Sequence, residues 1–137
     1  MTKAEKIQAL VRYRLEQAAE AIAAAELNLA NGLHRSAVNR AYYAMFYAVL
    51  ALLAARQEET SRHSGAIAQF DRLYVKPALL PKEFSRWLHG AFLNRQSVDY
   101  GAEVSLSNDE IDVLLSHARA FLAGVRNYLD ANPPGGT

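Results

Sequence analysis

The feature that most constrains this chain is a long helical repeat of apolar residues in its last third. From Ile111 onward, apolar side chains recur at the i, i+3, i+4 and i+7 spacing of one helix face: Ile111, Leu114, Leu115, Ala118, Phe121, Leu122, Val125 and Leu129. Ser107 and Glu110, like Thr2 and Glu5 near the N-terminus, have the spacing of a capping box. A helix with one apolar face must bury it, so the remaining chain has to supply partner elements.

The other apolar patterns predict four further helices and no strand, at about residues 3–30, 35–56, 62–74 and 81–100. Only 4 Pro and 7 Gly occur, and most of them fall between these segments. Amphipathic helices joined by short connections are typical of an antiparallel up-and-down bundle. We therefore predict an all-α fold of four main helices and one short helix. A single domain is expected over residues 1–131, with a flexible Pro- and Gly-rich tail over 132–137.

Composition and motifs exclude several classes of protein. The chain has 0 Cys, which excludes disulfides, thiolate zinc sites and cysteine nucleophiles. Its net charge of +1 argues against a basic protein that coats duplex nucleic acid, although a local basic cleft stays open. It has no phosphate loop and no serine nucleophile elbow, and His34, His89 and His117 stand singly. We predict no metal and no cofactor.

The sequence also indicates where the chain resides. No uninterrupted apolar run approaches the roughly 18 residues that a membrane span needs. Residues 1–5 carry charges where a signal peptide would need an apolar stretch. We therefore predict a cytoplasmic protein with no membrane partner.

The segment 81–100 carries charges where its apolar face continues. Arg95 lies eleven residues after Phe84, and Asp99 lies eleven residues after Leu88, which is about three helical turns in each case. One interpretation is an ion pair between Arg95 and Asp99 at a solvated helix end. Because the arginine precedes the aspartate, this pair has the weaker of the two possible orientations. The other is a partly buried arginine that is held at a cleft and oriented by Asp99.

A row of polar-tipped residues follows the apolar stripe of the segment 35–56. Asn39, Tyr43 and Tyr47 are spaced at i, i+4 and i+8. Such a row can contact a ligand, a partner helix or other buried polar groups, and tyrosine is favoured at interfaces. Packing at the edge of the core is one interpretation, and homodimerisation through this face is the other.

His63 stands two residues after Ser61, which is a candidate helix cap. His63 is then either an ordinary residue of the first helical turn, or a base or phosphate contact in a cleft. Both interpretations stay open from the sequence alone.

Three stretches of the chain together resemble the HEPN family, most closely its small stand-alone prokaryotic branch. They are NRAYYAMF at 39–46, SRH at 61–63 and RQSVDY at 95–100, in this order. The resemblance extends over about residues 18–129. It implies an up-and-down helical bundle that dimerises, and a metal-independent ribonuclease activity that is often found in toxins. It also implies a nucleotidyltransferase antitoxin as the partner.

The resemblance also implies a catalytic motif, in which an Arg is followed four to six residues later by a His, and two protomers bring these pairs into one cleft. Arg95 matches the Arg, but Tyr100 stands five residues further on, after Asp99. Tyrosine, with a pKa of about 10, exchanges protons poorly near pH 7, so His63 is the other candidate for proton transfer. The candidate catalytic residues are therefore Arg95, Asp99, Tyr100 and His63. The candidate binding residues are Asn39, Arg40, Tyr43 and Tyr47.

Three functions stay open on this basis. The first is a toxin-like, metal-independent ribonuclease. The second is a non-catalytic HEPN module that binds RNA, a nucleotide or a nucleotidyltransferase partner. The third is a structural bundle whose tyrosine row and Arg95 stabilise a dimer.

Overall fold

The computed structural model describes residues 1–58, 60, 62–99 and 106–134, and for residues 97–99 it places the backbone. Its helices are α1 (Lys3–Ala30), α2 (His34–Ala55), α3 (His63–Phe70), the π-helical turn η1 (Asp71–Val75), α4 (Lys82–Asp99) and α5 (Asn108–Ala131). No strand occurs in the described ranges. The predicted all-α bundle is confirmed.

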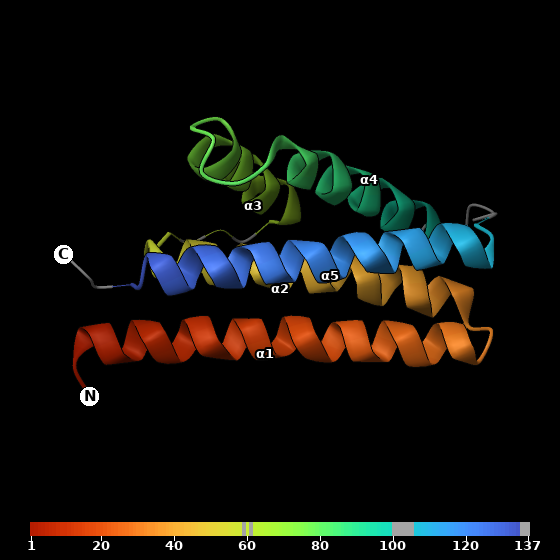
Figure 1. Ribbon diagram of the computed structural model, residues 1–137, viewed down its shortest axis with the longest axis horizontal. Helices are drawn as coiled ribbons and strands as arrows, with labels where there is room; N and C mark the ends of the chain where they lie inside the picture. The colour runs from red at the N-terminus through yellow and green to blue at the C-terminus, as the bar shows by residue number, and fades with distance from the viewer. Residues whose placement is uncertain (59, 61, 100–105, 135–137) are drawn as a thin grey trace.

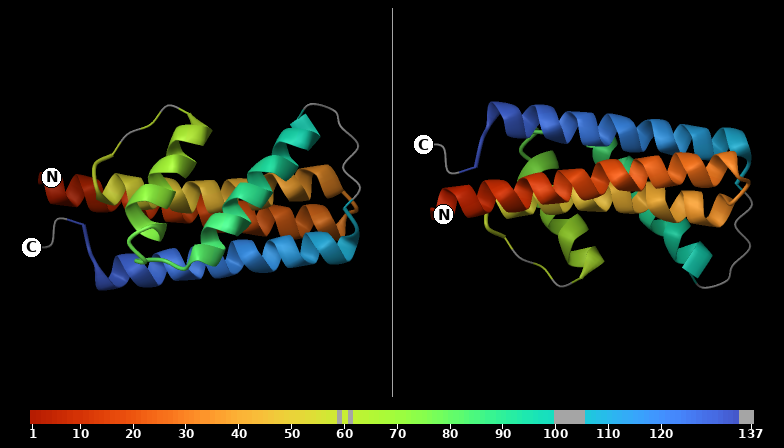
Figure 2. Two further views of the ribbon diagram at one scale, coloured as in Figure 1. Left: turned by 90° about the horizontal axis from the view of Figure 1, so that it is seen from above. Right: turned by 90° about the horizontal axis from the view of Figure 1, so that it is seen from below.

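The helices form two layers. The three long helices α1, α2 and α5 lie side by side, with α1 antiparallel to α2 (Figure 1). The pair α3–α4 lies across them as a V, whose arms converge at the loop that joins them and diverge toward the start of α3 and the end of α4 (Figure 2). The candidate site lies where these diverging ends pass over α2.

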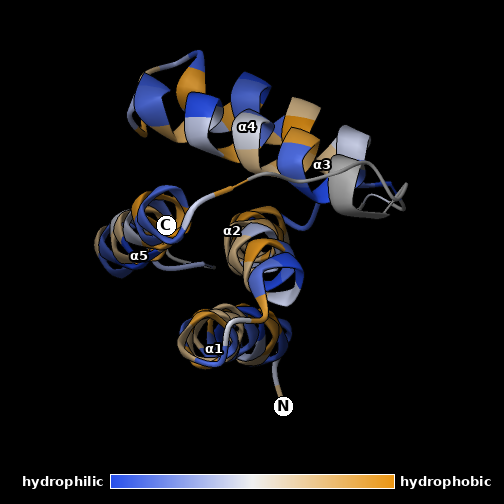
Figure 3. Ribbon diagram, turned by 90° about the vertical axis from the view of Figure 1, so that its right-hand side faces the viewer, coloured by the Kyte–Doolittle hydropathy of each residue, from blue (hydrophilic) through white to orange (hydrophobic). Residues whose placement is uncertain are grey.

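The helix α2 is the centre of the core. It lies between α1 and the α3–α4 layer, with α5 on a third side (Figure 3). By length and composition α2 could cross a membrane, and its residues 41–55 are all apolar. However, 67% of its most apolar stretch is buried inside the bundle, and a core helix meets the same criterion. Its apolar composition is explained by packing on three sides.

The contact between α1 and α2 depends on small side chains. Three alanines are buried on α1, at positions 18, 21 and 25. Five are buried on α2: Ala37, Ala41, Ala44, Ala48 and Ala51. Because the distance between packed helices is set by the side chains at the contact, alanines allow the two helices to approach closely.

The helix ends agree with the sequence signals where they are described. Both predicted capping boxes form, at Thr2 with Glu5 and at Ser107 with Glu110. The predicted cap Ser61 lies outside the described residues, and the N-cap of α3 is Arg62, which makes no side-chain capping bond. The end of the predicted third helix is the π-helical turn η1, which the sequence did not indicate.

A stack of aromatic rings joins α4 to α5. Phe84 stacks on Phe121 with 4.9 Å between ring centroids, and Trp87 stacks on His117 with 4.3 Å and 7° between planes. Gly124 of α5 makes room for the Phe84 ring, because a Cβ at this glycine would lie 2.5 Å from Phe84 Cζ. The glycine is therefore required by packing.

We expect Gly124→Ala to lower the free energy of unfolding by about 1–3 kcal/mol, because the buried Phe84 ring would be overpacked. This loss outweighs the gain of about 1 kcal/mol that alanine brings to a helix. Gly90→Ala in α4 is the matched control, since nothing lies within 4 Å of the added Cβ, and it should stabilise the protein. Urea unfolding measures both variants, and equal effects of the same sign would contradict the packing account.

Candidate functional site

A side chain from the start of α3 and one from near the end of α4 both reach the first half of α2, where they contact two consecutive tyrosines. Tyr42 contacts His63, the first residue of α3, and Tyr43 contacts Arg95 of α4. His63 and Arg95 are 32 positions apart in the sequence (95 minus 63). The V of α3 and α4 is what brings them to the same pair of tyrosines.

His63 is held by α2 through a hydrogen bond and a ring stack. Its Nδ1 lies 2.8 Å from Tyr42 Oη, and its ring lies on Phe46 with 4.1 Å between centroids and 10° between planes. Because a tyrosine hydroxyl both donates and accepts hydrogen bonds, it holds the imidazole whichever nitrogen carries the proton.

Tyr42 is fully buried, although its hydroxyl reaches the site. Burial raises the pKa of this hydroxyl well above its ordinary value, while the positive charge of Arg95 has a smaller, opposite effect. Tyr42 therefore stays protonated at neutral pH. Its role is that of a neutral hydrogen-bonding support for His63.

Arg95 is half-buried on the two tyrosine rings. Its Nη2 donates a hydrogen bond to Tyr43 Oη at 3.2 Å. Its guanidinium carbon lies 5.7 Å from the ring centroid of Tyr42 and 5.5 Å from that of Tyr43. Guanidinium groups at these distances are attracted to aromatic faces, so the rings fix the position of the charge.

A second arginine approaches Tyr43 from α2 itself. The guanidinium carbon of Arg40 lies 4.7 Å from the Tyr43 ring centroid, and Arg40 makes no ion pair with any other described residue. The Tyr43 ring thus contacts two guanidinium groups and the edge of the His63 ring, at 5.7 Å. Both guanidinium groups carry the planar donors that bind phosphate oxygens.

The structure brings together most of the residues that the sequence predicted. Arg95, His63, Tyr43 and Arg40 form one cluster, and the Tyr47 ring lies 5.6 Å from that of Tyr43. Arg95 is partly buried, as the interpretation of a cleft arginine requires.

The remaining predicted residues are only partly described. Asn39 is half-buried, and its Oδ1 is buried without a hydrogen-bond partner in the described chain. Asp99 is the last residue of α4, but its side chain lies outside the description, as does all of Tyr100. The roles of Asp99 and Tyr100 stay predictions.

Two residues of the cluster were missed as functional residues. Tyr42 and Phe46 orient His63, yet Tyr42 followed the apolar stripe of α2 in the sequence and was assigned to the core. It is a core residue as well, since its ring is buried. The one signal in the sequence was that Tyr42 and Tyr43 are consecutive, because two consecutive helix residues face different neighbouring helices.

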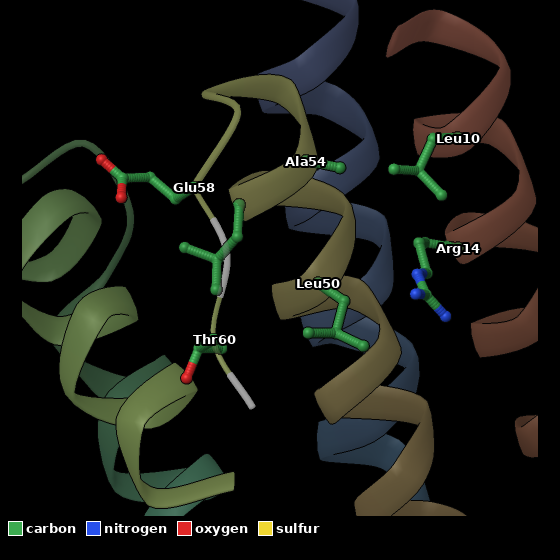
Figure 4. A pocket seen from close by; sticks show the side chains of 7 residues that line it. Leu10, Arg14, Leu50, Ala54, Glu58 and Thr60 are labelled. Carbon is green, nitrogen blue, oxygen red and sulfur yellow. The ribbon is translucent and has the colours of Figure 1, made fainter. Parts of the chain in front are cut away.

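Two pockets are lined by residues of both α1 and α2. The larger, of about 550 Å³, lies between α1, α2 and the connection to α3 (Figure 4), and is lined by Leu10, Arg14, Leu50, Leu53, Ala54, Glu58 and Thr60. The smaller, of about 240 Å³, is lined by Gln17, Glu20, Ala21, Ala24, Arg40 and Tyr47. The smaller pocket therefore shares Arg40 with the cluster.

Within the described residues, no group of three or more His, Asp and Glu side chains is placed to hold a metal ion. His89, which stands singly in the sequence, pairs with Asp71 of η1 at 2.7 Å. This pair links the two arms of the V at a distance from the arginine cluster.

The fold and the site define a small α-helical bundle with a cationic, aromatic site built around one histidine. The profile of the HEPN domain family matches residues 11–128. The chain belongs to the HEPN domain family, as the resemblance in the sequence indicated.

Curated proteins from bacteria and archaea are similar to this chain over most of its length. A "UPF0332 protein" of Thermotoga maritima is 35% identical over 130 residues, which cover 95% of this chain and 96% of the relative. "Putative toxin MJ0142" of Methanocaldococcus jannaschii is 34% identical, over 84% of this chain and 78% of its own length. "Putative toxin MJ0605" of the same organism is 30% identical, over 91% and 90%.

We expect Tyr42→Phe to lower the free energy of unfolding by about 1 kcal/mol at pH 7.5, because the hydrogen bond to His63 is lost. Folded Tyr42 keeps its proton above pH 10, whereas Tyr42 of the unfolded chain releases it. Ionisation therefore favours the unfolded chain, and the free energy of unfolding falls as the pH rises above about 10. The variant should lose less stability than the wild type between pH 9 and pH 11.

Urea unfolding at pH 7.5, pH 9 and pH 11 measures both effects. Tyr128→Phe is the control, because the Tyr128 hydroxyl makes no hydrogen bond in the described structure. A Tyr42→Phe variant as stable as this control, with the same pH dependence as the wild type, would contradict the assigned support role.

Proposed function

We propose that this HEPN protein is a toxin-like ribonuclease that cleaves RNA without a metal ion. The observation that carries the proposal is the convergence of Arg95 and His63 on Tyr42 and Tyr43. A guanidinium binds phosphate oxygens and stabilises the charge that develops on them, and an imidazole exchanges protons near pH 7. The names of the two archaeal relatives, which call them toxins, support the toxin-like part of the proposal.

The proposed reaction uses the RNA's own 2′-hydroxyl as the nucleophile. Its oxygen attacks the adjacent phosphorus, and the His63 imidazole takes the proton that it loses. The bond from phosphorus to the 5′ oxygen then breaks, water supplies the proton that this oxygen needs, and the hydroxide that remains takes the proton back from His63. The products are a 2′,3′-cyclic phosphate and a 5′-hydroxyl. Arg95 binds the phosphate throughout, while Arg40 adds positive charge beside it.

This assignment gives His63 the proton-transfer role that the family motif places five residues after Arg95. Tyr100 occupies that position in this chain, and Asp99 precedes it. In the proposal Asp99 orients Arg95, and Tyr100 is a further contact to the RNA. The histidine is thus supplied by α3 instead of by the chain that follows α4.

We expect purified protein to cleave single-stranded RNA in the presence of EDTA. Arg95→Ala should lower the cleavage rate about 100-fold or more, since it removes the group that binds the phosphate. His63→Gln should lower it by at least a similar factor. Arg86→Ala is the matched control, because Arg86 is a strongly exposed arginine of the same helix, and its rate should equal that of the wild type.

Gel electrophoresis of labelled RNA follows the reaction, and thermal unfolding checks that each variant is folded. Cleavage that requires a divalent metal ion, or that continues at the wild-type rate in Arg95→Ala, would refute the proposal.

A second candidate function is a non-catalytic HEPN module that binds RNA, a nucleotide or a nucleotidyltransferase through the same site. It is favoured by one observation, that Tyr100 stands in place of the family histidine. Binding of RNA that depends on Arg95, with intact RNA after long incubation, is the result that identifies it. The third candidate, a purely structural bundle, requires that neither binding nor cleavage depends on Arg95.

We further propose that two copies of the chain associate through the exposed first half of α1, and that a nucleotidyltransferase antitoxin neutralises the dimer. The exposed apolar side chains of Leu10 and Tyr13 on α1 support association through this face.

Light scattering should give the mass of two chains of 15.1 kDa each. Tyr13→Arg should shift the protein to one chain, because it places a charge in the interface, whereas Leu27→Arg should not, since Leu27 is an exposed apolar residue at the other end of α1. A wild-type protein that has the mass of one chain at every concentration would contradict the dimer.

A further inference from the structure

The smaller pocket beside the cluster has the dimensions and the chemistry of a site for one flat, polar ring. Its volume is about 240 Å³, and it lies between α1 and α2. Tyr47 and Arg40 line it from α2, while Gln17, Glu20, Ala21 and Ala24 line it from α1. The two alanines leave space between the helices that a larger side chain would fill.

The pocket is connected to the candidate phosphate site through shared or contacting side chains. Arg40 lines the pocket, and its guanidinium also lies over the ring of Tyr43. The Tyr47 ring lies 5.6 Å from the Tyr43 ring, whose hydroxyl accepts the hydrogen bond of Arg95. A ligand that has an anionic group at Arg95 and a flat ring one or two side chains away would span both places.

Tyr47 and Arg40 provide the flat surfaces that such a ring needs. Unpaired bases of RNA are bound by stacking on aromatic rings or on guanidinium planes, and their edges are then recognised by hydrogen bonds. A nucleotide combines this flat base with a phosphate a short distance away. The flat side chains that line the pocket and their contact with Arg95 through Tyr43 therefore point to a nucleotide unit of RNA.

The polar groups of the pocket select among the four bases. Gln17 is already engaged, since its Oε1 accepts a hydrogen bond from Arg14 Nη1 at 2.9 Å and its Nε2 lies 3.4 Å from Tyr13 Oη. Glu20, by contrast, is exposed and makes no hydrogen bond or ion pair in the described structure. Its carboxylate is an acceptor with two oxygens, so it fits a base that presents two neighbouring donors.

Guanine is the base that has this pattern on its pairing edge, where the N1–H and the N2 amino group lie side by side. Adenine, cytosine and uracil each present a donor next to an acceptor on that edge, so a carboxylate oxygen would face a lone pair. A carboxylate with two oxygens therefore accepts two hydrogen bonds from guanine and one at most from the other bases.

We propose that this pocket binds an unpaired guanine next to the phosphate at Arg95, with Tyr47 and Arg40 stacking on the base and Glu20 accepting from its pairing edge. The inference deepens the proposed function and rests on it for the identity of the ligand as RNA. It makes Glu20 a specificity-determining residue of a ribonuclease that cuts single strands beside guanine.

The test is a binding measurement that does not need cleavage. The probes are fluorescent 2′-O-methyl RNA hexamers, which lack the attacking hydroxyl, with five uridines and a central G, A, C or U. Fluorescence anisotropy on the full-length protein should show the G hexamer binding about tenfold or more tightly than the other three, in line with two hydrogen bonds to a charged group.

Glu20→Gln should reduce the preference for G to less than threefold, because an amide has a single acceptor oxygen. Glu16→Gln is the matched control, since Glu16 is an exposed glutamate of the same helix outside the pocket, and it should keep the full preference. Tyr47→Leu should weaken the binding of all four hexamers by a similar factor, because it removes a stacking surface.

Equal affinities for the four hexamers, or an unchanged preference in Glu20→Gln, would overturn the inference. So would the absence of binding by any hexamer, which would indicate that a second copy or another protein covers the pocket. The cleavage assay separates this inference from the proposed function. Cleavage without a preference for G refutes the guanine site but leaves the proposed ribonuclease activity intact. A preference for G in binding, without cleavage, refutes the ribonuclease activity but leaves the guanine site intact.

Discussion

Two consecutive tyrosines on α2 hold the two halves of the candidate site. Successive residues of an α-helix point about 100° apart, so one of the two rings enters the core while the other lies at its edge. Tyr42 is the buried ring, and its hydroxyl holds His63 of α3. Tyr43 is half-buried, and its hydroxyl and ring hold Arg95 of α4. The relative position of histidine and arginine therefore depends on one rigid, fully packed helix.

The rest of the bundle makes this helix rigid and leaves one side of it accessible. Buried alanines allow α1 to pack closely on α2, and α5 covers a further side. The accessible side has α1 as one wall and the V of α3 and α4 as the other. His63 and Arg95 come from the second wall, whereas Glu20 comes from the first. The charged and polar groups that could bind RNA are thus gathered on the face that the core does not need.

The sequence predicted the fold well because its signals are local. The period of 3.6 residues and the two capping boxes locate α1 and α5, and these signals need no knowledge of the rest of the chain. Arg95 was found by the same periodicity, since it continues the buried face of α4. What the periodicity could not predict was its partner, because the contact of Arg95 with Tyr43 joins residues 52 positions apart.

The support of His63 by Tyr42 and Phe46 was beyond sequence reasoning for a related reason. Both aromatic residues satisfy the apolar pattern of α2, so nothing in that pattern distinguishes a ring that only packs from one that also orients a histidine. Glu20 was likewise indistinguishable from any exposed glutamate of α1 until the pocket placed it near Arg40 and Tyr47. Such roles are set by which helices meet, and the tertiary arrangement of α3 and α4 decides that.

The central claim is that His63 and Arg95 act on one phosphate. Nuclear magnetic resonance tests it most directly, by titrating the protein with a 2′-O-methyl dinucleotide and following the imidazole signals of His63 and the guanidinium Nε–H of Arg95. The account predicts that both sets of signals shift with the same dissociation constant, and that the His63 shift disappears in Arg95→Ala. Shifts at only one of the two residues, or shifts with different dissociation constants, would contradict it.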